Sequence, residues 1–171
     1  MSQADYAEYA AYFLASSSSV IRYECLEITH SHFSQEYRVV RNATRGLTVT
    51  HENGQQYSYE YYPLEIENLG ASDDLDVGYS IRLGDTGDII WKEIERVLFN
   101  DAILEKPRVV YRAYRSDNLA KPLDGPNNLE MKDVTCAVEG ATFEAKAPLV
   151  NVHGTGEAYT PDRFPLRGFL Y

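Results

Sequence analysis

The sequence contains few of the residues that support redox or thiolate chemistry. Only two of its 171 residues are cysteines, Cys25 and Cys136, which lie far apart and do not form a CxxC pair. This spacing argues against a disulfide framework or a thiolate metal site, so we expect two buried free thiols on strands. The chain also lacks any apolar run of the roughly 18 to 20 residues that a membrane-spanning helix needs. We therefore expect a soluble protein.

Basic residues are also scarce relative to acidic ones. The chain has 16 Lys and Arg against 26 Asp and Glu, which gives a formal net charge of −10. A surface of this sign repels phosphate groups at long range, which argues against non-specific binding to nucleic acid or to an anionic membrane. Residues 1–5 contain no basic stretch before an apolar segment, so the sequence predicts no signal peptide.

Alternating polar and apolar residues predict many short strands, with turn residues about every ten positions. The strongest hairpin signal is Asn53-Gly54, because Asn-Gly readily adopts the two positive φ angles of a tight turn. Pro63 then excludes a central position in a ladder. The predicted strands cover about residues 20–29, 36–41, 47–50, 57–61, 62–66, 75–83, 108–114, 129–138 and 142–147, and both faces of 108–114 carry apolar residues.

Two helices are expected among these strands. A short amphipathic helix is predicted over Tyr6 to Leu14, and a longer one over about 88–102, where Ile94 and Val97 belong to an apolar stripe at helical spacing. The fold class that follows is mainly β, within α+β: an antiparallel β-barrel or sandwich with one long central helix and a short N-terminal helix. The expected organisation is an N-terminal helical arm (1–19), a core domain (20–150) and a C-terminal aromatic arm (151–171).

Candidate catalytic and metal-binding residues are present but poorly assembled. His30 and His32, with Glu27, could bind a metal, yet a structural zinc site needs four ligands. A cysteine nucleophile would need an exposed, electropositive setting, whereas both cysteines occupy apolar positions of predicted strands. The carboxylate groups at 73–76 and 85–88 are typical of solvated turns and helix caps, although such a loop could hold Ca²⁺ weakly. We therefore expect no enzyme, no catalytic or metal residue and no cofactor.

Fourteen tyrosines give the chain an unusual aromatic content. Four of them cluster, namely Tyr57, Tyr59, Tyr61 and Tyr62. They fit two interpretations equally: β-forming residues on a half-buried surface, or an aromatic band that faces a partner or a carbohydrate.

The C-terminal segment carries several aromatic residues close together. If free, it would expose on the order of 500 Å² of apolar surface, as large as the largest apolar patch on a typical monomer. We therefore expect it to dock, either on its own domain or on a neighbouring subunit. The residues predicted for such a subunit interface are Phe13, Phe164, Pro165, Phe169, Leu170 and Tyr171.

The order of these segments resembles a family of tailed-bacteriophage and prophage proteins that is catalogued as a domain of unknown function and encoded among minor tail genes. The resemblance covers nearly the whole chain. It rests on the Tyr/Ala-rich N-terminal helix and on the phrases Val39-Val40-Arg41, Tyr62-Pro63-Leu64-Glu65-Ile66, Arg108-Val109-Val110-Tyr111-Arg112-Ala113-Tyr114 and Arg163-Phe164-Pro165.

The resemblance implies a structural component of the virion, made in the cytoplasm of the host bacterium. Distal tail proteins of this type are generally β-barrels that form a hexameric ring between the tail tube and the tip hub. Such a ring would contact the tube protein, the hub and other tail-tip proteins, and DNA could pass through its lumen. The alternative from the residues themselves is a β-sandwich carbohydrate-binding module that uses the tyrosine cluster.

Overall fold

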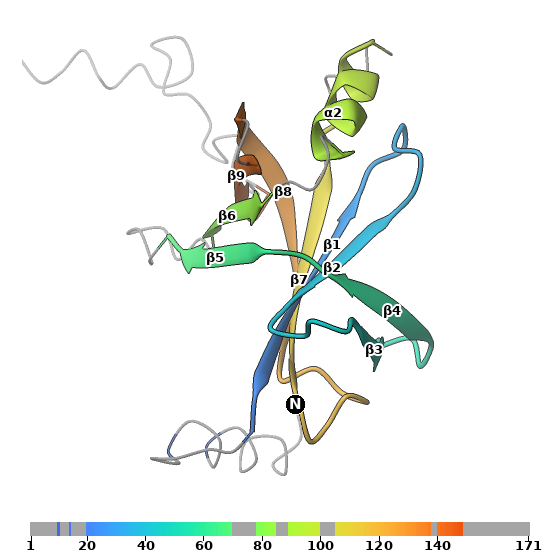
Figure 1. Ribbon diagram of the computed structural model, residues 1–171, viewed down its shortest axis with the longest axis vertical. Helices are drawn as coiled ribbons and strands as arrows, with labels where there is room; N and C mark the ends of the chain where they lie inside the picture. Colours follow the sequence, from blue (N-terminus) through green and yellow to red (C-terminus); the bar gives the residue numbers. More distant parts are fainter. Residues whose placement is uncertain are drawn as a thin grey trace, which may run out of the picture.

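The computed structural model describes residues 20–69, 78–84, 89–99, 105–137 and 140–148, together with Ala10 and Leu14. In these residues the chain forms nine strands and the helix α2 (Ile89–Phe99), shown in Figure 1. The strands are β1 (Arg22–Thr29), β2 (Tyr37–Arg41), β3 (Leu47–Thr50), β4 (Gln56–Tyr61), β5 (Leu64–Asn68), β6 (Gly78–Gly84), β7 (Arg108–Arg115), β8 (Asp124–Ala137) and β9 (Gly140–Lys146).

All nine strands belong to one mixed sheet, in the order β3-β4-β2-β1-β7-β8-β9-β6-β5. Neighbouring strands are antiparallel, except that β2 and β4 run parallel. The expectation of a mainly β protein is thus confirmed. No helix among the described residues is long and apolar enough to span a membrane.

The strands β4 and β5 form one path that bends at Tyr62 and Pro63. The backbone N–H of Tyr62 still donates to the carbonyl of Val40 in β2, at 3.3 Å. Pro63 has no N–H to continue that ladder, and from Leu64 onward the chain pairs with β6 instead, where Leu64 lies opposite Leu83. The same path therefore borders β2 with its first half and β6 with its second half.

The main hydrophobic core draws on strands from both ends of the sheet order. Its fully buried side chains include Leu26 and Ile28 from β1, Ile81 from β6 and Phe143 from β9. Val39 of β2 and Leu64 of β5 belong to the same cluster. Because one cluster contains side chains from β1, β2, β5, β6, β7, β8 and β9, the sheet must curve around it.

A second, smaller core lies under the β3–β4 hairpin. Cys25 of β1 and Tyr114 of β7, both fully buried, pack there with Val49 and Tyr59 of the hairpin. Successive residues of a strand point to opposite faces, so β1 and β7 contribute to the main core with one face and to this core with the other. This confirms that both faces of the strand at 108–114 are covered.

The long central helix expected over about 88–102 is not supported. The helix that the structure describes has 11 residues and is followed in sequence by Asn100-Asp101, residue types that are poor in a helix interior. It lies beside the β1–β2 loop (Figure 1) rather than across the sheet. The buried carboxylate of Glu93 accepts hydrogen bonds from the backbone N–H of Ser34 and the hydroxyl of Tyr37, each at 2.9 Å.

Both predicted arms fall outside the described residues. Of the N-terminal helix the structure describes only Ala10 and Leu14, which are helical and exposed. Phe13 and the C-terminal interface residues belong to the part that is not described, as does the side chain of Cys136.

Shortening a side chain at the centre of the main core tests whether the curved sheet encloses it. We expect Phe143→Ala to lower the free energy of unfolding by about 3–5 kcal/mol, because Phe143 is fully buried and its removal leaves a cavity. Urea titration followed by circular dichroism measures this. The control Val134→Ala, at an exposed position, should change it by no more than about 0.5 kcal/mol. Equal changes in the free energy of unfolding for the two variants would contradict the placement of Phe143 at the centre of the main core.

Candidate functional site

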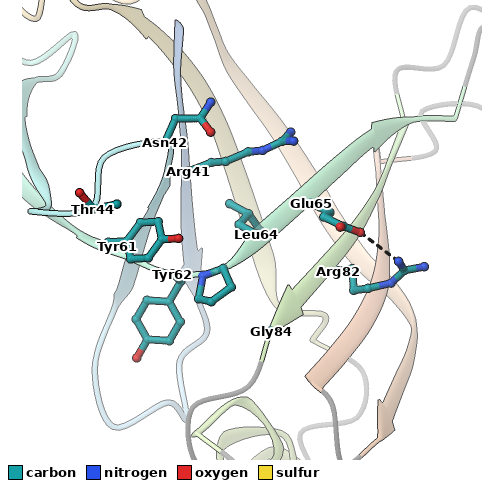
Figure 2. Close-up of a pocket in the computed structure, with 10 residues that line it drawn as sticks. Arg41, Asn42, Thr44, Tyr61, Tyr62, Leu64, Glu65, Arg82 and Gly84 are labelled. Carbon is teal, nitrogen blue, oxygen red and sulfur yellow. Dashed lines mark hydrogen bonds and ion pairs between the residues drawn. The ribbon is translucent and has the colours of Figure 1, made fainter. Parts of the chain in front are cut away.

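An open pocket of about 570 Å³ lies where the β4–β5 path leaves β2 and joins β6, as Figure 2 shows. Arg41, Asn42 and Thr44, from the end of β2 and the loop after it, form one part of its lining. Tyr61 and Tyr62, from the end of β4 and the bend, form another. The third part comes from the start of β5 and from β6. The pocket therefore exists because the ladder between β2 and this path stops at the bend.

Local backbone geometry shapes two sides of the pocket. Asn42 has a φ of 68°, in the left-handed region that asparagine adopts more readily than most residues. This turns the chain away from the end of β2. On the other side, the N–H of Gly84 donates to the carbonyl of Pro63 at 2.8 Å. A Cβ atom at Gly84 would lie 3.0 Å from the Cβ of Pro63, so glycine allows this close approach.

Each arginine of the pocket is matched by a carboxylate. Arg41 Nη1 donates to Glu24 Oε2 at 3.0 Å, from β2 to its neighbour β1. Arg82 Nη1 donates to Glu65 Oε2 at 2.9 Å, and Figure 2 shows this ion pair between β6 and β5. The two positive charges are therefore compensated locally, and the lining carries little net charge.

Glu24 also connects the pocket to a polar cluster at the edge of the main core. The buried hydroxyl of Tyr111 accepts a hydrogen bond from Arg22 Nη2 at 2.7 Å and donates to Glu24 Oε1 at 3.4 Å. Burial raises the pKa of Tyr111, so this hydroxyl stays protonated and available as a donor at neutral pH. Arg41 is thus held in place by Glu24, and the hydrogen bond from Tyr111 in turn fixes Glu24.

Several polar groups of the pocket have no partner among the described residues. The hydroxyls of Thr44, Tyr61 and Tyr62 make no hydrogen bond there, and Tyr61 is 43% exposed. On the edge of β5 away from β6, backbone groups also have no partner in the part of the chain that the structure describes. The N–H of Leu69 donates to β6, so by the antiparallel alternation the N–H and C=O of Leu64 and Ile66 point the other way.

Arg112 of β7 fixes the hairpin that carries Tyr61. Its guanidinium is nearly buried and donates from Nη1 to Glu27 Oε2 of β1 at 2.8 Å, and from Nε to Glu52 Oε1 of the hairpin turn at 3.2 Å. Arg38 of β2 adds a hydrogen bond to Glu27 at 3.1 Å, and its guanidinium carbon lies 4.5 Å from the centre of the Tyr57 ring. The hairpin is therefore held by charge as well as by its apolar face.

The buried side chain of His51 lies inside this arrangement. Its Nε2 is 2.9 Å from the hydroxyl of Tyr59, and its ring centre is 4.1 Å from that of Tyr57. Burial lowers the pKa of His51, and the positive charge of Arg112 lowers it further. His51 is therefore a neutral hydrogen-bonding residue at pH 7.

The four clustered tyrosines do not form one exposed band. Tyr59 is fully buried in the second core, and Tyr57 is half-buried between His51 and Arg38. Only Tyr61 and Tyr62 reach the pocket. No local signal in the sequence indicates that Tyr59 packs with Cys25 and Tyr114.

The other candidates from the sequence are placed as follows. Burial raises the pKa of the Cys25 thiol to about 12, which opposes a role as a nucleophile. His30 and His32 lie with ring centres 5.8 Å apart, yet His30 Nε2 is 3.0 Å from the backbone oxygen of Glu105. Among the described residues no group of three His, Cys, Asp or Glu side chains is arranged to hold a metal. The carboxylate groups at 73–76 and 85–88 lie outside the described residues.

A family model described as a domain of unknown function, DUF1833, matches residues 9–148. The chain belongs to the DUF1833 family. No match was found among curated proteins. The matched range contains every strand of the sheet and every residue of the pocket, so both belong to the DUF1833 domain.

Breaking the buried charge network should destabilise the DUF1833 domain far more than breaking an exposed ion pair. We expect Arg112→Ala to lower the free energy of unfolding by about 3–5 kcal/mol, because it leaves Glu27 with one cation fewer in a mostly buried position. The matched control Arg82→Ala removes an exposed pair and should cost about 0–1 kcal/mol. Urea titration of both variants measures the difference. A cost below about 1 kcal/mol for Arg112→Ala would contradict the structural role of the network.

The lowered pKa of His51 predicts a pH dependence. As the pH falls below about 6.5, the histidine of the unfolded chain binds a proton before the folded one does, so the free energy of unfolding decreases. His51→Gln removes this contribution and should flatten the dependence between pH 7.5 and pH 5.5. Urea midpoints at several pH values measure it. An unchanged slope in the variant would show that His51 does not titrate differently in the two states.

Proposed function

We propose that this protein is a non-enzymatic structural component of a bacteriophage tail tip, forming a ring that joins the tail tube to the tip hub. The resemblance of nearly the whole chain to minor tail proteins supports this assignment. The β4–β5 path, which pairs with β2 through β4 and with β6 through β5, supports a closed barrel, the architecture that ring-forming distal tail proteins generally use. In this proposal the protein is part of the virion and contacts the tube protein, the hub and other copies of itself.

The observation that carries the proposal is the outer edge of β3. The N–H of His51 donates to the carbonyl of Gln55, so by the antiparallel alternation Thr48 and Thr50 direct their backbone groups away from β4. Thr50 N–H donates to the carbonyl of Leu119 at 2.9 Å. Thr48 has no such partner in the part of the chain that the structure describes. An exposed strand edge of this kind favours pairing with another chain.

The hairpin that presents this edge is rigid. Its inner face packs on the second core, and its turn is tied to β7 by Glu52 and Arg112. In Figure 1 the hairpin projects to one side of the sheet, and β3 is the terminal strand in the sheet order. A contact element that is already ordered loses little conformational entropy when it meets a neighbour. This suits a protein that assembles into a closed ring.

The C-terminal residues Phe164, Phe169 and Tyr171 are proposed as a second contact with the neighbouring copy. The net charge of −10 supports a channel to which DNA would not adhere, since like charges repel. The carbohydrate-binding alternative loses Tyr57 and Tyr59, which are buried or covered, and keeps only Tyr61 and Tyr62.

Removing the backbone donor of Thr48 tests the role of the β3 edge. We expect Thr48→Pro to prevent ring assembly while the domain stays folded, because the lost N–H points away from β4 and makes no ladder bond. The control Thr48→Val keeps the donor and should assemble. Light scattering and native mass spectrometry of the full-length chain, alone and with its tail partners, measure the assembly.

Two results would contradict the proposal. One is a wild-type protein that stays monomeric both alone and with tail partners. The other is a Thr48→Pro protein that is folded by circular dichroism and assembles as the wild type does.

A further inference from the structure

We propose that the pocket between β2 and β5 binds an uncharged saccharide. This inference goes beyond ring assembly, because it rests on different residues from those of the β3 edge. It is carried by three properties of the pocket: compensated charge, an accessible aromatic side chain, and polar groups without partners.

The charge of the lining favours a neutral ligand. Arg41 is paired with Glu24 and Arg82 with Glu65, at 3.0 and 2.9 Å. A phosphate or carboxylate ligand would have to compete with these carboxylates, and it would also be repelled by them. A sugar hydroxyl needs no such exchange, because each guanidinium has five N–H donors and these ion pairs do not use all of them.

The aromatic contribution comes from Tyr61, since Tyr62 packs against the main core. Tyr61 is 43% exposed, and Figure 2 shows its hydroxyl directed toward the space beside Leu64. A pyranose ring has an apolar face of C–H groups that can lie on an aromatic ring, while the tyrosine hydroxyl remains a polar handle. Tyr61 is held in position because the hairpin that ends with it is fixed by Arg112.

The unpaired polar groups of the pocket are uncharged hydrogen-bond donors and acceptors, as sugar hydroxyls are. The hydroxyls of Thr44 and Tyr61 can each donate and accept, and neither has a hydrogen-bond partner among the described residues. Asn42 uses its amide nitrogen on the carbonyl of Arg22, which leaves its amide oxygen as an acceptor. The outward backbone groups of Leu64 add a donor and an acceptor. Sugar hydroxyls also donate and accept, so such a set can satisfy them without a net charge.

The shape of the pocket is consistent with this ligand and disfavours a peptide strand. Its volume of about 570 Å³ lies within the range of small-molecule sites, about 300–1,000 Å³. An extended peptide would instead need a row of unpaired backbone groups. By the alternation the outward backbone groups of β5 belong to Leu64, Ile66 and Asn68, and of these residues only Leu64 lines the pocket.

The test is a titration of the ¹⁵N-labelled full-length chain with three neutral oligosaccharides: maltohexaose, cellohexaose and chitohexaose. We expect at least one to shift the amide signals of Arg41, Thr44 and Tyr61. Tyr61→Ala should then weaken its binding at least tenfold, and Thr44→Val by a few fold. Val134→Ala, at an exposed position outside the pocket, should bind as the wild type does.

Three outcomes would overturn the proposal. The first is that neither these sugars nor a broad array of neutral glycans binds. The second is that binding shifts signals elsewhere or survives Tyr61→Ala unchanged. The third is that an anionic probe, oligogalacturonate, or an extended Thr-Val peptide binds the pocket in place of the neutral sugars. Thr48→Pro should leave sugar binding intact, and Tyr61→Ala should leave ring assembly intact, so failure of one proposal is distinguishable from failure of the other.

Discussion

The guanidinium of Arg112 stands at the junction of β1, β7 and the β3–β4 hairpin. Burying a positive charge is costly unless it is paired, and here Glu27 and Glu52 pair with it from two different elements. The pairing fixes the hairpin turn against the sheet. Because β4 continues directly into Tyr62 and Pro63, the position of the hairpin also determines where the chain leaves β2 and where the pocket opens.

The bend at Pro63 determines which strands the chain pairs with before and after it. One continuous path pairs first with β2 and then with β6, which brings the two sides of the curved sheet together around the main core. The ladder cannot continue through the bend, so polar side chains from β2 and tyrosines from β4 meet at the gap. A single structural device thus supports both the proposed barrel and the proposed ligand site.

The sequence predicted the features that depend on residues close together in the chain. Asn53-Gly54 predicted the β3–β4 hairpin, and the structure contains it, but only Gly54 has the expected positive φ, 77°. The prediction of a two-residue turn was wrong, because the last hydrogen-bonded pair is His51 with Gln55 and three residues lie between them. Pro63 predicted the interruption of the ladder. The helix was predicted at the correct place, over about 88–102, and the structure describes it over Ile89–Phe99.

What the sequence did not predict depends on contacts between distant residues. The parallel pairing of β2 with β4 has no local signature, and neither does the network that joins Arg112 to Glu27 and Glu52. Tyr57, Tyr59 and Tyr61 share one face of β4, so their different burial depends on how far the cover from β1 and β7 extends along that strand. Arg41 and Asn42 were overlooked as site residues because nothing in their own segment indicates that Tyr61 lies beside them.

Cryo-electron microscopy of the tail end of a particle whose genome encodes this chain can show whether the protein forms the proposed ring. We expect density for this domain as a closed ring of identical copies between the tail tube and the hub, with the β3 edge of each copy against its neighbour. A particle that lacks the chain, or that contains it only as single copies without contact to one another, would contradict the proposal.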